Sequence, residues 1–94
     1  ARVFQSIRIA LNNELDKLNK FLNSFVNNLK IGGRIVIISY HSTEDRMVKH
    51  AFKKLHFQKK MKIITKKPII PNIEEQNLNK RSRSAKLRAA ERIG

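Results

Sequence analysis

The chain has 94 residues and a formal net charge of +14 at pH 7, from 21 Lys and Arg against 7 Asp and Glu. The length suits one small domain, and the absence of cysteine excludes a disulfide framework and a thiolate metal site. No apolar run reaches the roughly 18 residues that a membrane-spanning helix needs, and no secretory signal pattern opens the chain. We therefore expect a soluble intracellular protein whose charge points first to nucleic acid as a partner.

The segment from residue 3 to residue 30 shows the clearest periodicity. Apolar side chains recur at steps of three and four, from Phe4 and Ile7 to Phe25 and Leu29, which places them on one helical face. The pattern predicts a long amphipathic helix, with a coiled-coil segment as the alternative because the repeat is also close to heptad spacing. A pair of glycines, Gly32 and Gly33, is expected to end the helix.

A strand is predicted directly after the two glycines. Residues 35–38 are four consecutive β-branched apolar residues, and this pattern is typical of a strand buried on both faces, as in a parallel sheet covered by helices. A second helix is predicted from residue 44 to residue 58, with Ser42 as its N-cap and Asp45 three residues later. A helix, a buried strand and a further helix in succession indicate an α/β domain.

The last third of the chain is predicted to hold three short elements. Residues 61–67 have the composition of a short strand, and the prolines of residues 68–71 force an extended connection after it. Asn72 is the expected N-cap of a short helix with two glutamates in its first turn. Residues 85–93 stay open between helix, which their propensity favours, and strand, which their alternation favours.

Polar side chains gather where the predicted strand ends. In open α/β sheets ligands bind at the carboxyl ends of the strands, so His41 and Ser42 are candidate catalytic, pocket-lining residues. The alternative is structural: Ser42 caps the second helix, and residues 44–46 form its solvated first turn. The G-x-S-x-G pattern of a Ser–His hydrolase is absent.

A basic cluster lies near the end of the chain. We expect its cations to contact RNA phosphates, with a solvated charge run as the alternative; they are Arg81, Arg83, Lys86 and Arg88. The chain has three glycines and no glycine-rich phosphate or dinucleotide loop, so we expect no cofactor-binding residues in it. Its three histidines lack metal-ligand spacing, so we expect no metal site.

Three sequence blocks, in order along nearly the whole chain, resemble the C-terminal portion of the bacterial small-subunit (16S) ribosomal RNA cytosine-N4 methyltransferase family. They are the opening ARVFQSIRIALNNEL, the central GGRIVIISYHSTEDRMVKHAF, and the closing KP-x-x-P followed by RSRSAKLRAAERI. The F-H-S-x-E-D-R motif of the family falls on residues 40–46, with Tyr40 in place of Phe. Its A-R-S-A-K-L-R motif falls on residues 82–88, with Ser82 in place of Ala.

The resemblance implies the C-terminal part of a Rossmann-like (class I) S-adenosylmethionine-dependent methyltransferase sheet with flanking helices. Residues 1–94 would then be the C-terminal portion of a single methyltransferase domain, with the N-terminal cofactor-binding half absent. The resemblance also implies that residues 85–93 form the closing strand of the sheet. His41 and Ser42 would border the mouth of the active site.

The implied activity is transfer of a methyl group from S-adenosylmethionine to N4 of a cytidine in the decoding region of small-subunit ribosomal RNA. The implied partner is the small ribosomal subunit, in the cytoplasm, without a membrane or a metal. We expect this chain alone to be inactive. Because the glycine loop is missing, a non-catalytic basic RNA- or ribosome-binding module, or a decayed fragment, is the alternative.

Overall fold

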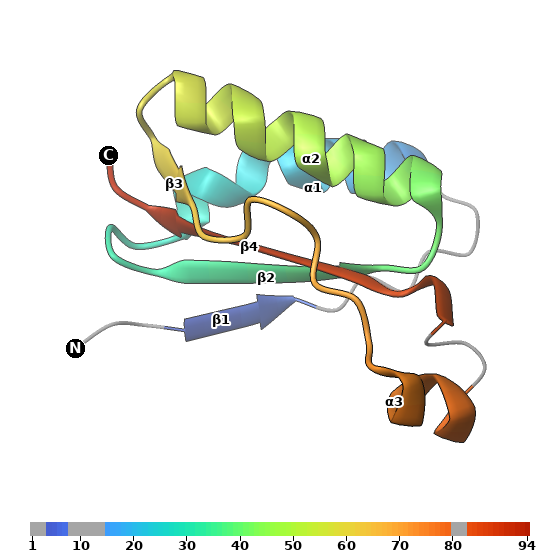
Figure 1. Ribbon diagram of the computed structural model, residues 1–94. Helices are drawn as coiled ribbons and strands as arrows, with labels where there is room; N and C mark the ends of the chain where they lie inside the picture. Colours follow the sequence, from blue (N-terminus) through green and yellow to red (C-terminus); the bar gives the residue numbers. More distant parts are fainter. Residues whose placement is uncertain (1–3, 8–14, 80–82) are drawn as a thin grey trace.

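The computed structural model describes residues 4–7, 15–79 and 83–94. The elements in chain order are β1 (Phe4–Ile7), α1 (Leu15–Asn28), β2 (Arg34–Ser39), α2 (Ser42–Phe57), β3 (Met61–Ile63), α3 (Ile73–Leu78) and β4 (Lys86–Arg92). Both long helices lie on the same face of one sheet, whereas α3 stands apart from it (Figure 1). The described fold is therefore a two-layer α/β arrangement.

The sheet has four strands in the order β1-β2-β4-β3. β1 runs parallel to β2, and β4 runs antiparallel to both of its neighbours. The sequence pattern left residues 85–93 open, and the strand implied by the resemblance is confirmed. Since Ser39 pairs with Lys86, the carboxyl end of β2 and the amino end of β4 lie at the same end of the sheet.

The prediction that β2 is buried on both faces is wrong for the described residues. Burial alternates along the strand: Ile35 and Ile37 are buried beneath the helices, whereas Val36 and Ile38 on the opposite face are only half-buried. The physical reason is that α1 and α2 both cover one face. A run of β-branched residues indicates a strand but does not report how many of its faces are covered.

The predicted helix over residues 3–30 is correct only in part. α1 spans Leu15–Asn28, whereas Phe4–Ile7 form β1, and the predicted helical residues 8–14 lie outside the described part of the chain. Phe4 and Ile7 fit a helical period by spacing alone. Pairing with the edge of β2, in the register Phe4 to Arg34, decides the conformation instead.

α1 ends at Asn28, before the two predicted glycines, which instead form the turn that leads into β2 and connect this turn to the last strand. Gly32 has a φ of +86°, a conformation that glycine adopts without steric strain. Its N–H donates to the Arg92 carbonyl at 2.7 Å, and the Arg92 N–H donates to the Gly33 carbonyl at 2.9 Å. The Arg92 guanidinium donates to the carbonyls of Val26 and Leu29, so it binds backbone acceptors at and just after the C-terminal end of α1.

The N-cap of α2 is His41 and not the predicted Ser42, which is the first residue of the helix. Glu44, three residues after the cap, reaches back with its carboxylate. Oε1 accepts the N–H of His41 at 3.2 Å and the N–H of Tyr40 at 3.3 Å. The signature of a polar residue followed three positions later by an acid was therefore present one residue earlier than we placed it.

The predicted strand over residues 61–67 is shorter in the structure, where β3 spans Met61–Ile63. Beyond it, Thr65 Oγ1 accepts the Ala89 N–H at 3.0 Å, and Ile69 forms an isolated bridge with Leu87. The connection therefore keeps following β4. The predicted short helix is confirmed as α3, where Asn72 Oδ1 accepts the Glu75 N–H at 2.8 Å.

The core lies between the two helices and the sheet. Phe25 of α1 meets Phe52 of α2 edge to face, with ring centroids 6.1 Å apart. Beneath them lie Ile35, Ile37 and Ala90 of the two central strands. Edge-to-face aromatic contact adds to the burial of apolar area, so this layer holds the helices over the strands.

Candidate functional site

Both predicted functional clusters include residues at one end of the sheet, where β2 ends and β4 begins. His41 and Ser42 directly follow β2, and Lys86 pairs with Ser39 at the last position of that strand. His41 and Ser42 are exposed, and their backbone begins α2. The carboxyl end of β2 is the position where open α/β sheets bind their ligands. The topology therefore brings the HSTEDR block and the RSAKLR block together at one end of the sheet.

The two blocks are joined by an ion pair that the sequence did not reveal. Arg88 Nε donates to Asp45 Oδ1 at 2.7 Å, and Arg88 Nη2 donates to Asp45 Oδ2 at 3.0 Å. Only 8% of Arg88 and 6% of Asp45 is exposed. Two parallel hydrogen bonds between a guanidinium and a carboxylate give the pair a defined geometry as well as charge compensation.

We therefore no longer expect Arg88 to contact RNA. Its guanidinium is buried and is held by Asp45, so phosphate contact would require breaking a desolvated pair. The structural alternative, in which residues 44–46 form a solvated first turn, is wrong for Glu44 and Asp45. Both carboxylates are buried, while Arg46 is exposed. The positive end of the helix dipole favours both acids at this place.

The remaining predicted RNA contacts differ in exposure. Arg83 is exposed and Lys86 is half-buried. Arg81 lies outside the described residues. Lys86 lies at the same end of the sheet as His41, and Arg83 precedes it by three residues in the sequence. The contact of both residues with RNA stays a prediction.

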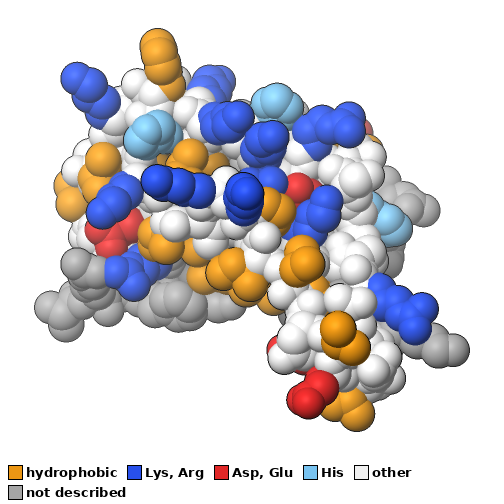
Figure 2. Space-filling view, viewed as in Figure 1, with side chains coloured by type: hydrophobic (Ala, Val, Ile, Leu, Met, Phe, Trp, Pro, Cys, Tyr) orange, Lys and Arg blue, Asp and Glu red, His pale blue; other side chains and the backbone are white. Residues whose placement is uncertain are grey.

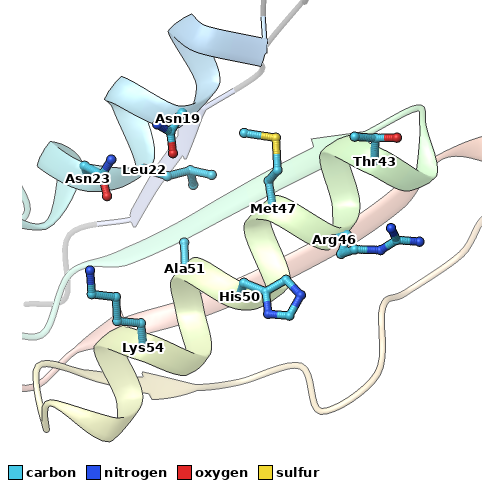
Figure 3. A pocket seen from close by; sticks show the side chains of 9 residues that line it. All are labelled: Asn19, Leu22, Asn23, Thr43, Arg46, Met47, His50, Ala51 and Lys54. Carbon is cyan, nitrogen blue, oxygen red and sulfur yellow. The ribbon is translucent and has the colours of Figure 1, made fainter.

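A groove on the helical layer is lined by other residues than His41 and Ser42. It lies between α1 and α2 and has a volume of about 330 Å³ (Figure 3). Leu22, Met47 and Ala51 form an apolar part of its lining. The polar part comes from both helices and consists of Asn19, Asn23, Thr43, Arg46, His50 and Lys54.

The described residues lack the glycine-rich turn with which proteins ordinarily bind a nucleotide-like cofactor such as S-adenosylmethionine. Such cofactors need a glycine-rich turn after a strand, so that the backbone can approach closely. β2 is followed instead by Tyr40 and His41, and β3 by Ile64 and Thr65. Gly32 and Gly33 precede β2, at the opposite end of the strand.

Two further properties concern the described part of the chain only. No helix within it combines the length and the apolar composition needed to cross a bilayer. Within the same residues, no group of three or more His, Cys, Asp or Glu side chains is arranged to hold a metal ion.

The sequence carries one signal for the ion pair. Arg88 is a single charge followed by Ala89 and Ala90 and preceded by Leu87, in what proved to be a central strand. A charged residue in a central strand needs a buried partner. The sequence does not specify which acid supplies it, because Asp45 lies 43 residues away.

Comparison with known proteins places these features in a family. The model of the MraW methylase family matches residues 1–93. The protein named "Ribosomal RNA small subunit methyltransferase H" of Kosmotoga olearia is 58% identical over 92 residues, which cover 98% of this chain and 30% of that protein. Proteins of the same name from Trichodesmium erythraeum and Thermotoga neapolitana are 52% and 53% identical, with 98% of this chain and 31% and 30% of those proteins covered. The chain therefore spans about a third of the length of the curated relatives that it matches.

Proposed function

The chain belongs to the MraW methylase family, and from this we propose that it is part of a ribosomal RNA methyltransferase. The activity proposed for the whole protein is transfer of a methyl group from S-adenosylmethionine to N4 of a cytidine in the decoding region of small-subunit RNA. The observation that carries the proposal is the family match over residues 1–93, with relatives at 52–58% identity that are named as small-subunit RNA methyltransferases. The proposed partner is the small ribosomal subunit in the cytoplasm.

We further propose that residues 1–94 form the C-terminal portion of one methyltransferase domain. The sheet supports this placement. β1 is the first strand of the described chain, lies at the edge of the sheet and pairs in parallel with β2. The outer edge of β1 can therefore accept further strands from a longer protein. The glycine-rich cofactor loop would lie in that other part, and this chain alone would be inactive.

In the whole protein, His41 and Ser42 are proposed to line the substrate pocket at the carboxyl end of β2. Arg83, Lys86 and Arg81 are proposed to contact the RNA backbone beside it. Exposure of His41, Ser42 and Arg83 supports these roles, as does the pairing of Lys86 with Ser39 at the same edge. The buried pair of Asp45 and Arg88 holds the two motifs in place.

The test is methylation of small ribosomal subunits by the natural polypeptide that contains this chain, with labelled S-adenosylmethionine and nucleoside analysis by mass spectrometry. We expect N4-methylcytidine as the product and a lowered kcat for His41→Ala. His56→Gln is the matched control, because His56 is exposed at the far end of α2. Absence of labelled cytidine would contradict the function, whereas wild-type kcat for His41→Ala would contradict only the role of His41.

A non-catalytic RNA- or ribosome-binding module remains the second candidate. The specific observation in its favour is that no glycine-rich turn follows β2 or β3. Calorimetric titration of the 94-residue chain with S-adenosylmethionine tests whether the cofactor site lies outside this chain, and the methylation assay above separates the two candidates. We expect no heat of binding from the folded chain, and stoichiometric binding would show that our division between the two parts is wrong.

A further inference from the structure

One long stretch of the chain is purely basic. Between residues 46 and 73 the sequence has nine Lys and Arg and no Asp or Glu. All nine are exposed, and Figure 2 shows Lys and Arg side chains gathered across the region of α2 and the segment that follows it. We call the exposed cations of residues 46–67 the basic face. The acids of α2 do not neutralise it, because Glu44 and Asp45 are buried in the first turn.

The basic face has no internal neutralisation among the described residues. The ion pairs found there join Arg34 to Glu91 and Arg88 to Asp45, and neither includes a cation of this face. Clustered like charges repel one another and produce a positive surface potential that attracts an anionic partner. The basic face is therefore suited to bind a polyanion. It is separate from the predicted contacts at Arg83 and Lys86.

The geometry of α2 turns part of this charge into an ordered row. Arg46, Lys49 and Lys53 follow one another at steps of three and four, so they share one side of the helix. From the first to the last the helix rises about 10 Å. The other side of α2 is fixed by Val48 and Phe52, which are fully or almost fully buried. The row is thus carried by a helix that is anchored on the sheet.

The groove between α1 and α2 runs beside this row. Arg46 belongs to both features, and Lys54 adds a second cation to the groove. Asn19 and Asn23 line the groove from α1 (Figure 3). Amide side chains offer donors and acceptors to base edges, and the apolar floor suits the flat surface of a base. Phosphate-binding cations beside an amide-lined groove match a nucleic acid strand.

We propose that the basic face and the adjoining groove bind single-stranded RNA, with the phosphates on the cations of α2 and bases toward the groove. The choice of RNA rests on the proposed function, while the surface itself rests on the charge and geometry above. An anionic membrane is disfavoured, because an interfacial helix must offer its apolar side to lipid. In α2 that side, which includes Val48 and Phe52, is packed on the sheet.

The test is binding of a labelled, mixed-sequence single-stranded RNA to the 94-residue chain, measured by fluorescence anisotropy over a series of KCl concentrations. The variant is Lys49→Gln with Lys53→Gln. The matched control is Lys20→Gln with Lys30→Gln, which removes the same charge from two exposed positions outside the basic face. Circular dichroism verifies that both variants keep the wild-type fold, and this is expected because all four lysines are exposed.

We expect the Lys49/Lys53 variant to bind RNA at least several-fold more weakly, and its slope of log K against log[KCl] to decrease in size by about 1.4, or about 0.7 per lost phosphate contact. The control should keep most of the affinity and slope. Equal weakening in both variants would show a diffuse charge effect and overturn the proposal, as would an unchanged slope for Lys49/Lys53. Binding to anionic vesicles but not to RNA would overturn it in favour of a membrane.

This assay needs no methyl transfer, so its outcome is independent of the methylation test above. RNA binding through α2 without methylation by the longer protein would contradict the enzymatic function and leave the basic face intact. If the longer protein methylates RNA but the Lys49/Lys53 variant binds RNA as tightly as wild type, the enzymatic function stands and the proposed role of the basic face is contradicted.

Discussion

The guanidinium of Arg88 and the carboxylate of Asp45 form a buried pair with two hydrogen bonds, Nε to Oδ1 at 2.7 Å and Nη2 to Oδ2 at 3.0 Å. The pair ties β4 to the first turn of α2. It therefore fixes the end of the sheet at which His41 and Lys86 are found. Two motifs that are separate in the sequence act as one structural unit.

Removing one partner of this pair is expected to be severe. Arg88→Leu leaves the Asp45 carboxylate buried without compensation, and we expect a loss of about 3–5 kcal/mol of unfolding free energy. A small domain has only about 5–15 kcal/mol in total. Urea unfolding followed by circular dichroism measures the effect.

The double variant Asp45→Leu/Arg88→Leu is the control for that experiment. Because it removes both charges, it should recover part of the stability lost in Arg88→Leu. Equal or additive losses in the single and double variants would contradict a direct coupling of the two residues.

Loss of the Glu44 carboxylate should weaken the start of α2. Glu44→Ala leaves the N–H groups of Tyr40 and His41 without this acceptor, and loss of a capping interaction costs about 0.5–2 kcal/mol. Thr43→Ala, at an exposed neighbouring position, should change stability by less than about 0.5 kcal/mol. Identical midpoints for the two variants in urea would contradict the capping role.

Two arginines at the same end of the sheet should differ in their effect on stability. Arg92→Met removes the donors to the carbonyls of Val26 and Leu29, and hydrogen bonds from a charged group contribute about 1.5–3 kcal/mol. Arg34 pairs with Glu91 at 2.9 Å but is more than one-third exposed, so Arg34→Met should cost at most about 1 kcal/mol.

Thermal unfolding of both variants, each compared with wild type, measures this difference. Added salt should reduce the effect of Arg34→Met further, since exposed charges are screened. A larger loss for Arg34→Met than for Arg92→Met would refute the proposed anchoring of α1 by Arg92.

The two adjacent glycines are expected to respond differently to alanine. A Cβ on Gly33 would lie 2.8 Å from the Lys30 carbonyl oxygen and 2.9 Å from a Leu29 methyl, so the turn itself must move. A Cβ on Gly32 meets no atom within 4 Å, but its φ of +86° is strained for alanine by about 1–2 kcal/mol. We expect Gly33→Ala to be the more destabilising in urea unfolding. The opposite order would mean that the turn relaxes readily around Gly33.

Some local features could be predicted because their causes are local. A chain reversal at Gly32 and Gly33 was predicted, since a backbone with positive φ suits glycine, although α1 itself ends earlier, at Asn28. Asn72 caps α3 because its side chain reaches an N–H three residues away. β2 was predicted from a run of β-branched residues. That run did not predict that the helices cover only one of its two faces. The family motifs also placed the closing strand, where the propensities of residues 85–93 alone left two choices.

The sequence by itself determined the α/β class, the existence of α2, β2 and α3, and the basic character of the protein, because these follow from periodicity, capping and charge within short segments. Only the tertiary structure decided that Phe4–Ile7 pair as a strand, since a helical spacing of two apolar residues cannot outweigh the hydrogen bonds offered by an edge of β2. It also decided the roles of the cations. Arg88 is buried against Asp45 and Lys49 is exposed on α2, and this difference depends on distant chain segments that burial brings into contact.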